Sequence, residues 1–257
     1  MNLRIIIKFI LIIILTTASI QAEESPYNYS PKELSRSLEV TNPTVENRVH
    51  RRSNMWMNIT NWGFFGNRKI GTSEAMEDPE YPGTWAPQCE YPGGSDVQYL
   101  FMGTLWVGAL VQEEGYEFPR VSTGSEGWFQ PRIYEFFPGS GPDDGIEERT
   151  TRANQWNRLG DYISHPLAVS EQDFIAVFSD TLTDPYWLNS DPIDGPHYPL
   201  GIKIIQKSYS WTYNYAQDFI IIDYEIENIA SNYLKNVYVG LYVDADVGRI
   251  DEFPDWH

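Results

Sequence analysis

The chain has 257 residues, of which 36 are Asp or Glu and 18 are Lys or Arg, so its formal net charge is −18. Because phosphate backbones are bound by cationic surfaces, this charge argues against a nucleic-acid partner. Hydrophobic residues make up 42% and charged residues 21% of the chain, which excludes a mostly disordered protein and a polytopic membrane protein. The single cysteine, Cys89, excludes an internal disulfide framework and any multi-cysteine metal site.

Residues 1–22 have the three parts of a secretory signal peptide. Arg4 and Lys8 form a positively charged start, an apolar run follows over residues 9–15, and small residues allow cleavage after Ala18 or Ala22. The apolar run is shorter than the roughly 20 residues that a membrane span needs, so we expect no transmembrane span after removal of the signal. The sequence therefore predicts an exported protein, secreted or held at the cell surface.

Export would place the single cysteine in an oxidising compartment. Cys89 lies within residues 85–94, a stretch rich in Pro and Gly. The sequence leaves three states open: a buried and inert thiol, a partner for a cysteine outside these 257 residues, or a nucleophile beside a histidine that is close in space.

Residues 23–54 are polar and contain three prolines, so we expect a linker with one short helix around residues 31–40. From Met55 the sequence changes to short apolar and aromatic runs that Gly, Pro, Asn and Asp separate. This pattern predicts one β domain over residues 55–257. Six strands are expected, over residues 99–112, 132–137, 173–179, 201–213, 218–228 and 234–244.

The last two expected strands show the clearest alternation. In residues 218–228 the apolar side chains occupy every second position and acidic side chains stand between them, which predicts one face on a core and one in water. Residues 234–244 repeat the apolar pattern after a turn-rich loop over residues 228–232. A loop of this length joins antiparallel neighbours, so the two strands are expected to form a hairpin.

Many strands separated by turn residues predict an all-β fold, and a sheet needs a second layer to cover its apolar face. The predicted fold class is an antiparallel β-sandwich, Ig-like or related, with a barrel as the alternative. The chain stops at His257 directly after an acidic loop and without a closing strand. We therefore expect the domain to be incomplete at its C-terminus and the chain to be the N-terminal fragment of a larger protein.

Standard catalytic signatures are missing from the sequence. It contains no H-E-x-x-H, C-x-x-C, P-loop or G-x-G-x-x-G motif. The 36 acids offer too many carboxyl pairs for a glycosidase pair to be selected by spacing. The sequence therefore assigns no catalytic and no cofactor-binding residue.

An acidic loop near the end of the chain has the oxygen donors that calcium prefers. Asp244 and Asp246 stand two apart at the end of an expected strand, and Asp251 and Asp255 follow within the same loop. Arg249 occupies the slot where an EF-hand has its turn glycine, and no flanking helices are evident, so a plain solvated loop is the alternative. The segment over residues 141–148 offers a second acidic run, for which a plain turn is the favoured interpretation.

Nine tryptophans are distributed along the whole chain beyond the signal. Exposed Trp and Tyr rings can stack on sugar rings, whereas aromatics in a sandwich most often fill the core. We expect most of these tryptophans to be buried. Trp128 and Trp187 lie in expected loops and are the candidates for glycan stacking.

Five segments together resemble a protein family; they cover residues 58–66, 91–108, 199–211, 218–228 and 237–248. They are similar to large, uncharacterised exported proteins of Gram-negative bacteria that use the type IX secretion system. The resemblance implies export, a β-sandwich and a multidomain parent at the cell surface, and it implies no catalytic residues. These 257 residues contain no C-terminal sorting domain, which fits an N-terminal fragment.

The expected function is that of a non-enzymatic, exported β-sandwich module of a larger cell-surface or secreted protein, used for adhesion or for binding extracellular polymer or glycan. Calcium is expected to stiffen the acidic loop. The alternative is a glycan-active hydrolase or the accessory region of one, and a purely structural spacer is a third possibility.

Overall fold

The computed structural model describes residues 4–10, 40–66, 76–125, 134–188 and 196–249. These residues form strands, turns and loops, and none of them is helical. A helix long and apolar enough to cross a membrane is accordingly not found in this part of the chain.

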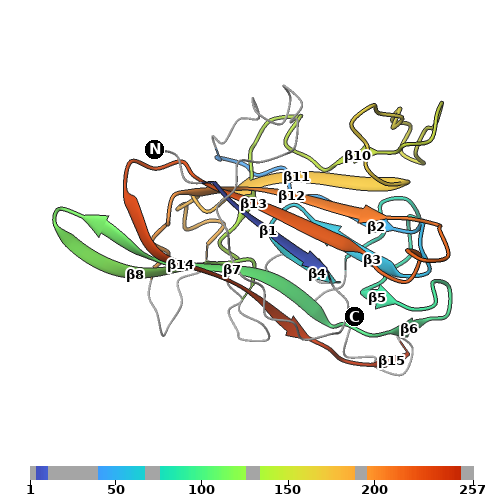
Figure 1. Ribbon diagram of the computed structural model, residues 1–257, viewed down its shortest axis with the longest axis horizontal. Coiled ribbons are helices and arrows are strands. Elements are labelled where there is room, and N and C mark those ends of the chain that lie inside the picture. Colours follow the sequence, from blue (N-terminus) through green and yellow to red (C-terminus); the bar gives the residue numbers. More distant parts are fainter. Residues whose placement is uncertain (1–3, 11–39, 67–75, 126–133, 189–195, 250–257) are drawn as a thin grey trace.

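One sheet has six strands, all paired antiparallel (Figure 1). Its order is β1 (Arg4–Ile10), β13 (Ile221–Asn228), β12 (Ile202–Ser210), β11 (Gln172–Ser179) and β10 (Glu147–Arg149), and β9 (Phe137–Pro138) also pairs with β11.

The other sheet has nine strands and is also antiparallel throughout. Its order is β14 (Tyr233–Asp244), β7 (Met102–Glu113), β4 (Phe64–Gly66), β3 (Trp56–Thr60), β5 (Cys89–Glu90), β6 (Val97–Gln98) and β15 (Gly248–Arg249). Two further strands flank this path, β2 (Asn47–His50) on β3 and β8 (Tyr116–Thr123) on β7.

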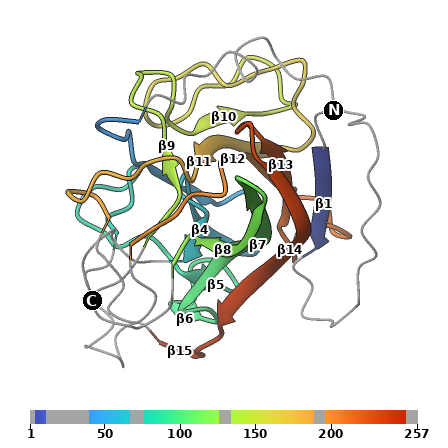
Figure 2. The same cartoon turned by 90° about the vertical axis from the view of Figure 1, so that its left-hand side faces the viewer.

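The two sheets lie face to face with the main core between them (Figures 1 and 2). Alternate residues of β7, β11, β12 and β13 point into this core, as the pleat of a strand allows. The core includes Leu105 and Val107 from β7, Phe174 from β11, Ile204 from β12 and Tyr224 from β13. Within the described residues neither sheet closes on itself, so the predicted sandwich, and not the alternative barrel, is confirmed.

Five of the six predicted strands are present, with ends that differ by up to three residues: β7, β11, β12, β13 and β14. The exception is residues 132–137, of which 132 and 133 lie outside the described residues and only Phe137 is in a strand. The buried aromatic rings of this segment produced the β-like pattern. Glu135 between them bonds from its backbone N–H to the carbonyl of Thr123, at the end of β8, and the segment passes there as a loop.

The predicted hairpin of the last two long strands is wrong. β13 pairs with β12 and β1, whereas β14 pairs with β7 in the opposite sheet. The connecting loop turns over the edge of the sandwich, where the N–H groups of Ile229 and Ala230 both donate to the carbonyl of Gly201, at 2.9 and 3.2 Å. Alternation reports which face of a strand is buried, and it does not report which strand is the neighbour.

The face of β13 that was expected in water is also buried. Ile222, Tyr224 and Ile226 face the core as predicted, but Asp223 and Glu225 on the opposite face are buried as well. Ile205 lies directly opposite Glu225 on β12 and belongs to a second-face apolar cluster that includes Ile175 and Val177. The six-stranded sheet therefore packs on both of its faces in this region.

Two strands come from segments with other expected roles. β1 lies within the predicted signal peptide and pairs with β13 along its whole length, from Arg4 opposite Glu227 to Ile10 opposite Ile221. β2 lies within the predicted linker and pairs with β3, and its residues Val49 and His50 are buried. Residues 31–39 of the expected short helix lie outside the described residues.

Candidate functional site

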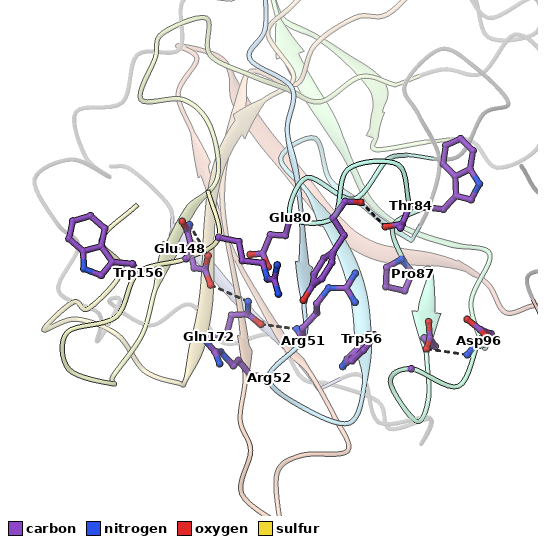
Figure 3. A pocket seen from close by; sticks show the side chains of 16 residues that line it. Arg51, Arg52, Trp56, Glu80, Thr84, Pro87, Asp96, Glu148, Trp156 and Gln172 are labelled. Carbon is purple, nitrogen blue, oxygen red and sulfur yellow. Dashed lines mark hydrogen bonds between the residues drawn. The ribbon is translucent and has the colours of Figure 1, made fainter. Parts of the chain in front are cut away.

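A cleft of about 500 Å³ opens at one end of the sandwich, where the two sheets meet (Figure 3). The nine-stranded sheet contributes Trp56 at the start of β3 and Glu90 at the end of β5. The six-stranded sheet contributes Glu148 on β10 and Gln172 at the start of β11. The remaining walls are loops, over residues 51–52, 80–87, 94–96 and 156–158.

Aromatic side chains line this cleft from several directions: Trp56, Tyr81, Trp85 and Trp156. Trp85 is 48% exposed and Trp156 is 64% exposed, which is unusual for such large apolar rings. Figure 3 places Trp156 at one end of the cleft, on the side of Glu148, and Asp96 and Pro87 at the other. The rings are therefore distributed along the cleft, and those of Trp85 and Trp156 are the most open to solvent.

A tight turn presents Tyr81 and Trp85. The backbone N–H of Asp78 donates to the carbonyl of Thr84 at 2.9 Å, and Glu77 and Trp85 form an isolated β-bridge. Gly83 sits at the tip with φ of +84°, a conformation that an L side chain rarely adopts. The turn is thereby fixed, and its Tyr81 and Trp85 rings are 38% and 48% exposed.

Arg51 holds this turn against the sheet. Its guanidinium forms an ion pair with Asp78, which is fully buried. The same guanidinium lies over the ring of Trp56 at 4.6 Å and over the ring of Tyr81 at 4.8 Å. A second arginine, Arg158, stacks over Tyr81 at 4.4 Å, so one tyrosine contacts two guanidinium groups.

Trp56 lies flat on a glycine turn. A Cβ atom added to Gly93 would come within 2.3 Å of the indole nitrogen, so only glycine lets the backbone approach the ring this closely. The N–H of Gly93 donates to the carbonyl of Asn54 at 2.6 Å, which ties the turn to the segment before β3. The ring of Trp56 is therefore packed directly against the backbone of this turn.

Amide and carboxyl groups connect the two sheets beneath the rings. The side-chain carbonyl of Gln172 accepts from the backbone N–H of Arg51 at 2.8 Å, and its amide donates to Glu148 at 3.1 Å. Asn157 donates to the other oxygen of Glu148, also at 3.1 Å. Glu148 is thus held on two sides, and its position in the cleft is fixed.

Glu80 is the cleft carboxyl with an altered acidity. Partial burial raises its pKa, and the nearby charges of Glu148 and Asp78 raise it further, while Arg51 and Arg158 act in the opposite direction. A carboxyl group with a raised pKa holds its proton at higher pH and can donate a hydrogen bond or a proton.

Cavities of this size, with aromatic walls and a few fixed polar groups, are typical of small-molecule and carbohydrate sites. The aromatic faces can pack against the apolar face of a sugar ring, and the amide, carboxyl and guanidinium groups can bond to its hydroxyls. The cleft therefore combines the two kinds of contact that sugar binding uses.

The predicted calcium loop is only partly described. Asp244 ends β14, where its carbonyl accepts from the N–H of Phe101 at 2.8 Å, and Asp246 is exposed two residues later. Burial raises the pKa of Asp244, and the charge of Asp246 adds to the effect. Asp251 and Asp255 lie outside the described residues. In the described part of the chain, no three His, Cys, Asp or Glu side chains come together as metal ligands would.

The second acidic run, over residues 141–148, begins with a turn, as the favoured interpretation of the sequence expected. The N–H of Asp144 donates to the carbonyl of Gly141 at 3.1 Å, and the Asp144 carboxylate accepts from the N–H of Gly141 at 2.7 Å. Asp144 is buried by this arrangement.

The tryptophans differ from expectation. Trp187 packs its ring edge toward Phe137, at 6.2 Å between centroids, and is half-buried against a second apolar cluster; Trp128 lies outside the described residues. Of the seven tryptophans in the described ranges only Trp62 is buried, so the expectation that most fill the core is wrong for this set. The exposed cleft rings Trp85 and Trp156 were not selected from the sequence.

The sequence contains one local signal for the cleft, in the turn over residues 80–85. Glu80 to Trp85 reads Glu-Tyr-Pro-Gly-Thr-Trp, a turn with an aromatic ring on each side. Such a turn presents rings outward, whereas a ring within an apolar run faces a core. The partners across the cleft, on β10 and β11, are more than 60 residues away and could not be matched to it without the fold.

Cys89 lies on β5 and is buried, and burial raises the pKa of its thiol to about 12. A thiol in this state is not a nucleophile at neutral pH. Of the three states left open by the sequence, the structure supports the buried, inert one.

A second polar network, which we call the Asp180 clasp, is sealed at the opposite end of β11. Asp180 is fully buried, and its carboxylate accepts from the hydroxyl of Ser122 at 2.7 Å and from three backbone N–H groups, those of residues 200, 201 and 202, at 2.6, 3.1 and 2.8 Å. His197 bonds to Glu135 at 3.0 Å and to the carbonyl of Asp180 at 2.7 Å. Ser122 belongs to β8, so the clasp also joins the two sheets.

Comparison of the chain with protein-family models, with curated proteins and with solved structures finds no match. No family model, curated relative or solved structure therefore links the chain to type IX secretion proteins.

Proposed function

We propose that the protein is a non-enzymatic, exported β-sandwich module of a cell-surface or secreted protein, and that it binds extracellular polysaccharide in the cleft between its sheets. The observation that carries this proposal is the exposure of Trp85 and Trp156 on the walls of a cleft whose polar groups are already fixed by hydrogen bonds. Large apolar rings left in water at a concave site mark a binding surface. The signal peptide predicted over residues 1–22 supports a ligand outside the cell.

A specific observation favours one second candidate. Glu80, with its raised pKa, shares the cleft with Glu148. Glycoside hydrolases use a protonated carboxyl as acid and a second carboxylate as base or nucleophile. The second candidate is therefore a glycan-active hydrolase, with Glu80 as the acid.

Two assays on the same polymers separate the candidates. We would measure the retardation of the protein in native gels that contain neutral or acidic polysaccharides, and the release of reducing ends in solution. Retardation without reducing-end release supports the binding module. Release of reducing ends that is abolished by Glu80→Gln would establish the hydrolase. If no polymer retards the protein and none is cleaved, the remaining interpretation is a structural spacer.

We also propose that calcium binds the loop that begins at Asp244 and Asp246. A ligand that binds only the folded state stabilises it, by about 2.7 kcal/mol when its concentration is 100 times the dissociation constant. The melting temperature should therefore rise in calcium relative to chelator, and Asp244→Asn with Asp246→Asn should remove the rise. Equal melting temperatures in calcium and chelator for the wild type would remove this proposal.

A further inference from the structure

A second cleft, of about 390 Å³, lies next to the first. Glu148 lines both clefts, so they are separated by little more than one side chain and the loop that contacts it. The second cleft is polar, and among its lining residues are Arg48, Asp143, Glu147, Asp161, Tyr162 and His165.

The loop over residues 150–165 forms the divide between the clefts. Trp156 and Tyr162 face each other across it in an isolated antiparallel bridge, with ring centroids 5.2 Å apart at 68°. Trp156 lines the first cleft and Tyr162 lines the second, and Tyr162 is 53% exposed. Each cleft therefore has an exposed ring on the same divide.

Asn157 holds this loop in place. Its side-chain carbonyl accepts from the N–H groups of Leu159 and Asp161 at 3.1 and 2.8 Å, and its amide donates to Glu148. The N–H of Asn157 donates to the carbonyl of Asp161 at 3.0 Å. The two rings are thus carried by a fixed loop that is tied to the carboxylate shared by both clefts.

Charge indicates what can occupy the second cleft. Its carboxyl groups outnumber its cationic groups, and Arg48 is already paired with Glu46 at 3.1 Å. An acidic sugar polymer would be repelled there, and the formal charge of −18 adds to the repulsion. Carboxylates accept hydrogen bonds from uncharged hydroxyl groups, so a neutral sugar fits.

We propose that a neutral, linear oligosaccharide binds across both clefts, with Tyr162 as the stacking residue of the second. This inference rests on the proposed function and adds the class of ligand: an uncharged chain several sugars long. A short sugar would fill the first cleft alone. A longer chain passes Glu148 and gains the contacts of the second cleft.

The test is affinity as a function of chain length. Neutral cello-, manno- and laminari-oligosaccharides, from the disaccharide to the octasaccharide, would be titrated calorimetrically into the wild type and into Tyr162→Ala. For the series that binds, we expect affinity to rise at least tenfold from disaccharide to hexasaccharide. Tyr162→Ala should lower the hexasaccharide affinity roughly tenfold, as expected for one lost stacking contact, and leave the disaccharide affinity within twofold.

Matched variants give the test its controls. Tyr162→Phe keeps the ring and should bind like wild type, and Tyr186→Ala removes an 83% exposed tyrosine that lines neither cleft. The inference would be overturned if affinity were the same at every chain length. It would also be overturned if Tyr162→Ala and Tyr186→Ala bound the hexasaccharide with the same affinity. Either result would leave the proposal of glycan binding intact. Tighter binding of oligogalacturonate would overturn the neutral class. Binding of no oligosaccharide would overturn the proposed function itself.

Discussion

A polar network lies at each end of strand β11; one is closed to solvent and the other supports an open cleft. At its C-terminal end, the Asp180 clasp is closed: the carboxylate accepts four hydrogen bonds and is fully buried. At its N-terminal end, Gln172 and Glu148 support an open cleft in which Trp156 is 64% exposed. Both networks join the two sheets. In the clasp the Asp180 carboxylate is bonded within the protein, whereas in the cleft hydrogen bonds fix Glu148 and Gln172 and the rings of Trp85 and Trp156 stay exposed.

The largest effect on stability is expected in the clasp. Asp180→Ala leaves three backbone N–H groups and Ser122 without their acceptor, which should lower the free energy of unfolding by roughly 3–5 kcal/mol. Urea unfolding measures this change. Ser122→Ala removes a single donor and, as a milder variant, should cost about 1–3 kcal/mol.

The exposed Asp246 is the matched control for Asp180. Asp246→Ala, measured in chelator, should change the free energy of unfolding by less than about 0.5 kcal/mol. A clasp variant that is no less stable than this control would show that the closed network does not hold the sheets together.

The cleft end also contains a buried support, His50, whose effect depends on pH. His50 packs on Phe174 and bonds to Ser208 at 2.7 Å, and burial lowers its pKa to about 3. Because its folded pKa lies below the unfolded value of about 6.5, its contribution to stability is present above pH 6.5 and is lost as pH falls toward 3. Between pH 7 and pH 4.5 the wild type should lose about 2–3 kcal/mol more than His50→Gln. Parallel stability curves for the two proteins would refute this role.

The clasp histidine should respond to pH in the opposite direction. Burial alone would lower the pKa of His197, but its hydrogen bond to Glu135 and the charge of Glu135 outweigh burial and raise it. A raised folded pKa stabilises the protein below the unfolded value, and this stabilisation is lost as pH rises through the folded pKa. The stability difference between wild type and His197→Gln should therefore shrink from pH 6 to pH 9. A difference that grows over this range would contradict the assignment.

The smallest effect on stability is expected at the cleft rim. Trp156→Ala removes a ring that is mostly in solvent, so the free energy of unfolding should change by no more than about 0.5 kcal/mol. Polysaccharide affinity should fall roughly tenfold, because a stacking ring is lost. A large loss of stability in this variant would assign Trp156 to the fold instead of to binding.

The sequence predicted the layers of the fold better than their connections. Alternation located β11, β12 and β13 and the side of β13 that faces the core, because the period of a strand is local. Alternation did not reveal that β14 lies in the other sheet, beside β7 and not beside β13. The short polar loop between the two strands is compatible both with a hairpin and with a crossing between sheets. Short strands such as β5 and β6, of two residues each, carry too few residues for any period to show.

The site was harder to predict than the fold. Trp187, selected from the sequence as an exposed loop ring, packs on an apolar cluster, whereas Trp85 and Trp156, which were not selected, are exposed. Gln172 belongs to the cleft only because β11 brings it beside Arg51, 121 residues away. Contacts at such separations depend on strand order, which local patterns do not contain.

The claim that the cleft binds polysaccharide is tested most directly by removing its two most exposed rings together. Trp85→Ala with Trp156→Ala would be compared with Tyr186→Ala in native gels that contain the polymer that retards the wild type. The account predicts that the double variant migrates as it does without polymer, while Tyr186→Ala is retarded like the wild type. Equal retardation of the double variant and the wild type would contradict the account.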